Sequence, residues 1–126
     1  MVPHTGWAVA VLASGTAAHP VVVHRERVLL CPDELPRQAY HAAQRLPHAS
    51  AARLVAEVDA AVARTTAATL DHLLTTAAAH GRVVGMGLLG TPRPLPELDQ
   101  ALANHTMLHS AEGELYRGAL DDAAAA

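Results

Sequence analysis

Residues 50–90 read SAARLVAEVDAAVARTTAATLDHLLTTAAAHGRVVGMGLLG, and this stretch decides the expected fold. Valines and leucines recur at three- and four-residue spacings over its first part, which predicts a helix with one buried face. The buried stripe consists of Val55, Val58, Val62, Leu70 and Leu73, with Thr66 and Ala77 between them. Ser50 is a suitable N-cap, and Gly81 suits the left-handed position after the last turn. The most apolar run of the chain follows, and it predicts a strand from Arg82 to Leu89.

The expected helix is long for a chain of this size. Unbroken, it would measure roughly 45 Å at about 1.5 Å per residue, which exceeds the width of a small domain. It therefore either bends near the run Thr65–Thr69, because threonine is a weak helix former, or it projects and meets a partner. Both alternatives stay open.

Two apolar runs precede this helix. Gly6–Ala13 is almost continuously apolar, which is typical of a strand covered on both faces. Val21–Leu30 is β-branched at both ends and polar in the middle, so it is either one long strand or a hairpin that turns at Arg25-Glu26. One long strand, antiparallel to the first, is favoured because HRER offers no Gly or Asn for a primed turn.

Prolines divide the rest of the chain. Those at positions 32, 36 and 47 leave room for only a short helix over Arg37–Arg45. The run TPRPLP at residues 91–96 predicts an extended connector, and Pro96 opens a second short helix that ends at Ala103. A last helix is expected over about Met107–Leu120, followed by a frayed tail at residues 121–126.

These elements predict one α/β or α+β domain over residues 1–126, in which the long helix crosses a small mixed sheet of three to four strands and the C-terminal helices pack beside it. The order strand, strand, helix, strand, helix, helix, together with TGWAVAVL at residues 5–12, is similar to a pared-down ribonuclease-H-like domain of the resolvase type. Nucleases of that family hold two metal ions with carboxylates from the first strand, the central strand and the last helix. Neither GWAVAVLA nor RVVGMGLLG contains an acid. We therefore expect no nuclease activity of that type and carry over no catalytic residue.

The composition favours assembly. The chain is 51% hydrophobic but has no Phe, Ile or Lys, a pattern that resembles a GC-rich, bacterial-like coding sequence. A core of Ala, Val and Leu buries little area per residue, so oligomerisation is a reasonable way to add stability. A homodimer is therefore expected.

Charge and cysteine content exclude several classes of partner. The formal net charge is −3, and acids and arginines are interspersed without a basic stripe, so neither nucleic acid nor a membrane is expected as a partner. The single Cys31 excludes an internal disulfide and favours a reducing, cytoplasmic compartment. The run Trp7–Ala13 is too short to span a bilayer, and no Lys or Arg precedes it as in a signal peptide.

The densest group of reactive side chains is NHTMLHSAEGELYR at residues 104–117. In one continuous helix, His105, His109, Glu112 and Tyr116 share a face. His109 and Glu112 are then candidates for catalytic acid–base work, and His105 and Tyr116 for ligand contacts. The same set could supply two or three ligands to zinc, but no third histidine follows at a fixed spacing, so no metal or other cofactor is expected. Alternatively, Ser110 caps a helix that starts there, which would separate the two histidines.

Three further residues are candidate ligand contacts. Tyr40 and His41 lie on the short helix behind the prolines, although Tyr40 could equally cover the edge of the core. Arg93 in TPRPLP either presents its guanidinium to a carboxylate or phosphate or is simply solvated. Residues 85–90 spell GxGxxG, but no helix follows at once, so a dinucleotide site is not expected there.

The sequence thus favours a non-catalytic binding or assembly module, because neither an acid–nucleophile set nor a cofactor loop is recognisable. The alternative is a small enzyme or a protein that binds a small molecule. Its pocket would lie between the Tyr40-His41 helix, the Arg93 loop and the His109-Glu112 turn. Convergence of these side chains around a concave space would favour the alternative.

Overall fold

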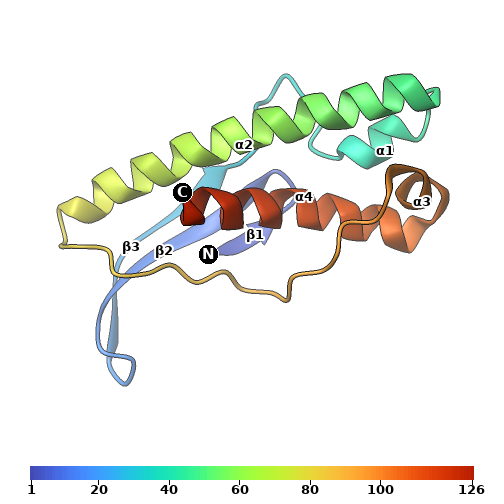
Figure 1. The fold of residues 1–126 in the computed structure, drawn as a ribbon. Coiled ribbons are helices and arrows are strands. Elements are labelled where there is room, and N and C mark those ends of the chain that lie inside the picture. The colour runs from blue at the N-terminus through green and yellow to red at the C-terminus, as the bar shows by residue number, and fades with distance from the viewer.

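The computed structural model spans residues 1–126 and combines a small sheet with four helices. In chain order the elements are β1 (Val2–His4), β2 (Trp7–Gly15), β3 (Pro20–Leu29), α1 (Ala39–Ala43), α2 (His48–Ala78), α3 (Leu98–Ala103) and α4 (His105–Ala125). Figure 1 shows α2 and α4 side by side across the sheet, with α1 and α3 together at one end of the pair. The expected class is confirmed: a three-stranded sheet carries one long helix and C-terminal helices.

The sheet is an antiparallel meander in the order β1-β2-β3. Val2 lies opposite Val9, and Trp7 lies opposite Leu29, with a shift of register between Leu12 and Ala13. Pro20–Leu29 is one long strand antiparallel to β2, as the lack of a turn signal in HRER predicts. All pairs are antiparallel, so the expectation of a mixed sheet is wrong.

Only one face of the sheet is covered. Ala8, Ala10 and Val28 point toward the helices and are buried, whereas Val11 and Leu29 on the opposite face are 44% and 45% exposed. Alternate residues of a strand point to opposite faces, and the two long helices α2 and α4 lie on the same side of this sheet. The expectation that the first strand is covered on both faces is therefore wrong.

Helix α2 buries the face that its spacing predicts. It is continuous over 31 residues, and Val58, Val62 and Leu73 are at most 5% exposed. The threonine run does not break it, and Thr66 is fully buried within it. The helix begins at His48 after Pro47, so Ser50 lies in its first turn and is not the N-cap. At the other end, Gly81 has a φ of +137° and donates its N–H to the carbonyl of Ala77.

The segment from Ala79 to Glu97, called the connector below, contradicts one prediction. Arg82–Leu89 is not a strand but irregular extended chain on the surface. From residue 82 to residue 96, its backbone hydrogen bonds to the rest of the chain involve only Met1, which donates to Gly87 and accepts from Leu89.

Two physical reasons explain the missing strand. The connector passes an N-terminal strand of three residues, which offers too short an edge for a ladder. Its glycines also lose much conformational entropy on ordering and provide no side chain to pack. Without this strand there is no crossover unit, and the ribonuclease-H-like order lacks the strand that should follow the long helix.

The C-terminal helices begin and end differently from the prediction. Helix α3 starts at Leu98, after Glu97, and not at Pro96. Helix α4 starts at His105, because the side chain of Asn104 accepts the N–H of Met107 at 3.1 Å and so caps it. Ser110 is therefore not an N-cap, and the helix runs on to Ala125 through the tail that was expected to fray.

One buried cluster joins the sheet to all four helices. It contains the inward residues of β2 and β3, the stripe of α2, and Leu108, Ala111, Leu115 and Leu120 of α4. None of the helices combines the length and the apolar character that crossing a membrane requires.

Candidate functional site

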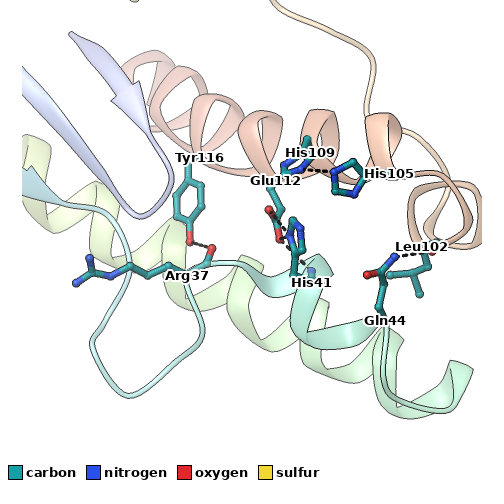
Figure 2. A network of polar contacts seen from close by, with 8 residues as sticks. All are labelled: Arg37, His41, Gln44, Leu102, His105, His109, Glu112 and Tyr116. Atoms are coloured by element: carbon teal, nitrogen blue, oxygen red, sulfur yellow. Dashed lines mark hydrogen bonds and ion pairs between the residues drawn. The ribbon is translucent and has the colours of Figure 1, made fainter.

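The candidate site lies where α1 packs against the first half of α4. Because α4 is continuous from His105, the side chains of His105, His109, Glu112 and Tyr116 lie along one side of it. Figure 2 shows these side chains and His41 of α1 gathered at the contact between the two helices.

A buried carboxylate connects the two helices. Glu112 is 3% exposed, and its Oε1 accepts the backbone N–H of His41 at 3.0 Å. The Nδ1 atom of the His41 ring lies 2.8 Å from Oε1 and 2.9 Å from Oε2 of the same carboxylate. When Nδ1 donates to this carboxylate, the Nε2 atom of His41 is left free for another partner.

Two further imidazoles stand beside His41. The Nε2 atoms of His105 and His109 are 3.0 Å apart, and the ring centroids of His41 and His109 are 4.9 Å apart. One ring nitrogen from each of the three histidines lies within 4.8 Å of the other two. We call His41, His105 and His109 the histidine triad. His41 is partly buried and the other two are exposed, so the triad is open to solvent on one side.

The spacing of the triad is close to that of metal ligands. Zinc binds imidazole nitrogen at about 2.0–2.1 Å, so two nitrogens on a tetrahedral ion are about 3.3 Å apart. The distance of 3.0 Å between His105 and His109 is near this value. Rotations of the exposed rings would bring the widest pair, at no more than 4.8 Å, to the same spacing.

Tyr116 and Tyr40 are buried beside the site. The Tyr116 hydroxyl donates to the carbonyl of Arg37 at 2.5 Å, and both tyrosine side chains are at most 4% exposed. Burial raises the pKa of Tyr116, and the neighbouring Cys31 thiol raises it further. Burial also raises the pKa of Tyr40, helped by the charges of Asp59 and Glu112. The contact of Tyr116 fixes the loop before α1 to α4.

Arg93 is not brought to the triad. It lies exposed in the connector and makes no hydrogen bond or ion pair. It was expected near the pocket as a guanidinium on the rigid extended run TPRPLP. Since the strand expected at residues 82–89 does not form, the connector carries Arg93 along the surface.

A polar groove borders the triad along α1. It has a volume of about 820 Å³ and is lined by Thr5, Pro36, Arg37, Gln38, His41, Ala42 and Arg45. We call it the α1 groove. His41 belongs both to this groove and to the triad, so the two features are adjacent.

The sequence indicates the candidate residues but not which of them are partners. The spacing of α4 placed His105, His109 and Glu112 on one face, and Tyr40-His41 was noted separately. What it missed is that His41 meets Glu112 from 71 residues away and supplies the third histidine, which no fixed spacing along α4 could reveal. The only signal in the sequence is a His-x-x-x-His pair in one expected helix together with a single histidine in another.

No protein-family model, curated protein or solved structure matches this chain. The function is therefore inferred from the geometry of the site.

Proposed function

We propose that this protein binds a divalent transition-metal ion, with zinc as the first candidate, through His41, His105 and His109. The observation that carries the proposal is the gathering of three imidazole nitrogens within 4.8 Å from two different helices. The assignment departs from the expectation that no metal is bound, but it keeps the class of binding modules that the sequence favours.

The donor set suits particular metals. Imidazole is a good ligand for zinc, copper, nickel and iron, whereas magnesium and calcium prefer oxygen. The triad contains neither a thiolate nor a directly facing carboxylate, so it favours the first group. Two imidazole nitrogens at 3.0 Å can share only one hydrogen, but both can direct a lone pair at one ion.

Glu112 supports a metal role for His41. Histidines that bind metals usually donate their other ring N–H to a carboxylate or carbonyl, which fixes the ring and raises its basicity. The contacts of 2.8 and 2.9 Å between His41 Nδ1 and Glu112 are of this kind when His41 binds the ion through Nε2. The carboxylate is buried and also holds the backbone of α1, so the orientation of the ring is set by the fold.

Binding fits the site better than catalysis. Three protein ligands with an open side leave a coordination position for water, as in catalytic zinc sites. However, Glu112 is engaged by His41, and no other carboxylate contacts the three rings. A free general base next to the open position is therefore missing. The small enzyme remains the second candidate, since the open position is its main requirement.

The homodimer and the cytoplasmic location are kept as parts of this proposal. Cys31 is free and buried, which is compatible with a reducing compartment. The uncovered face of the sheet, with Val11 and Leu29 exposed, is a surface that a second copy could cover. Sedimentation velocity at high protein concentration tests the dimer, and a strict monomer would remove it.

Titration of cobalt(II) into protein made without a histidine tag tests the metal site. We expect one equivalent to bind, with the visible absorption of a four- or five-coordinate ion. Loss of an outer carboxylate typically lowers metal affinity about 10- to 100-fold, so loss of a ligand in His109→Gln should lower it by at least about 100-fold.

His80→Gln is the matched control, because His80 is exposed in the connector just after α2 and lies outside the triad. Its affinity for cobalt should equal that of the parent protein. Binding that is far below one equivalent, or equal in the two variants, would remove the proposed function.

A further inference from the structure

The α1 groove is polar and lacks an acidic residue. Five of its seven lining residues have polar side chains, and two of these are arginines. A volume of about 820 Å³ is sufficient for a small molecule. This lining suits a hydrophilic anion better than an apolar ligand.

The guanidinium groups in the groove are accessible to an anionic ligand. Arg45 is exposed and makes no hydrogen bond or ion pair, and the side-chain amide of Gln38 is also unpaired. Arg37 contacts Asp33 at 3.1 Å, but both side chains are exposed, and such surface pairs contribute little. The planar guanidinium group matches carboxylate and phosphate oxygens and binds them with two parallel hydrogen bonds.

His41 places the triad at the side of this groove. An ion held by three neutral imidazoles keeps its full double charge, and its open position holds an exchangeable water. An anionic oxygen that replaces this water would meet positive charge from the ion and from the groove. His41 and the two arginines line the same groove, so a bound ion and the guanidinium groups would attract the same anion.

We propose that a metal ion on the histidine triad and the guanidinium of Arg45 together bind a small oxyanion, a phosphate or a carboxylate, in the α1 groove. This inference rests on the proposed metal site. It extends that site from ion binding to recognition of an anionic ligand.

Titration of the cobalt-loaded protein with inorganic phosphate, and separately with acetate, tests the inference. We expect at least one of the two anions to change the visible spectrum of the bound cobalt. A response to phosphate alone assigns a phosphate-bearing ligand, a response to acetate alone a carboxylate, and a response to both a general oxyanion site.

Arg45→Gln should lower the affinity for the anion roughly 10-fold or more, because a charge-assisted hydrogen bond is lost. It should leave the affinity for cobalt unchanged. Arg82→Gln, in the exposed connector, is the matched control and should leave both affinities unchanged. Cobalt binding without any response to either anion overturns this inference alone, as does equal anion affinity in Arg45→Gln. Absence of cobalt binding overturns it together with the proposed function.

Discussion

The contact between α1 and α4 and the connector are opposite kinds of structure. The helix contact is rich in polar residues, yet Tyr116, Glu112 and Tyr40 are 1%, 3% and 4% exposed. The connector contains the most apolar run of the chain, yet Val84 and Leu89 are 84% and 65% exposed. A residue is buried when another surface is there to cover it, and the apolar character of its own segment is not sufficient.

The two regions also differ in how they are attached. Hydrogen bonds between residues far apart in the chain join Glu112 to His41, Tyr116 to Arg37 and Gln44 to Leu102 (Figure 2). The central part of the connector has such bonds only to Met1. A buried polar group that loses its partner costs considerable free energy, whereas an exposed apolar side chain contributes little. Of these two regions, the contact between α1 and α4 should therefore be the more sensitive to mutation.

Glu112→Ala is expected to show the largest effect on stability. It removes a buried carboxylate and leaves the backbone N–H of His41 unpaired, so the free energy of unfolding should fall by about 3 kcal/mol. Urea denaturation measures this change. Asp121→Ala on the exposed side of the same helix is the control and should stay within about 0.5 kcal/mol. If Glu112→Ala also lost no more than about 0.5 kcal/mol, the contact of Glu112 with His41 would contribute no more to stability than an exposed side chain does.

The second largest effect is expected at alkaline pH, which should destabilise the contact between α1 and α4. Burial raises the pKa values of Tyr40 and Tyr116 above the ordinary value of 10.0. Above about pH 10 the unfolded chain releases these protons while the folded chain retains them. The free energy of unfolding should then fall with rising pH, by up to about 1.4 kcal/mol per pH unit for each tyrosine.

The variant Tyr116→Phe separates this effect from other causes of alkaline unfolding. It should cost about 1 kcal/mol at neutral pH, because the carbonyl of Arg37 loses its donor, but its stability should fall less steeply above pH 10. Equal slopes for the parent and Tyr116→Phe would show that the tyrosine is not the titrating group. Chemical denaturation at a series of pH values gives both numbers.

The smallest effect is expected in the connector. Val84→Ala should change the free energy of unfolding by less than about 0.5 kcal/mol, because Val84 is already in water. The same substitution at Val58, which is fully buried in α2, should cost about 2 kcal/mol. If both variants lost the same stability, residues 82–89 would be packed like the strand that the sequence predicts.

The same contrast explains which parts of the fold the sequence could predict. The valine and leucine stripe of α2 has a helical periodicity, and the two long strands are apolar or β-branched runs of strand length, so all three could be recognised locally. The strand at residues 82–89 could not be judged in this way, because a strand also needs a partner edge. Apolar sequence shows that a segment can pair, and it does not show that an edge is free.

For the site, the spacing of residues along one helix could be read from the sequence. Contacts between two helices could not. The spacing placed His109 and Glu112 on one face, although a helix capped by Ser110 would have separated the two histidines. The partnership of Glu112 with His41 depends on how α1 packs, and this packing is set by the buried cluster as a whole. The third histidine therefore required the folded structure.

X-ray absorption at the zinc edge of tag-free, zinc-loaded protein tests the central claim most directly. We expect three imidazole nitrogens at about 2.0–2.1 Å and one further light atom from solvent or an anion. A spectrum with one imidazole or none, or with a shell of oxygens only, would contradict it.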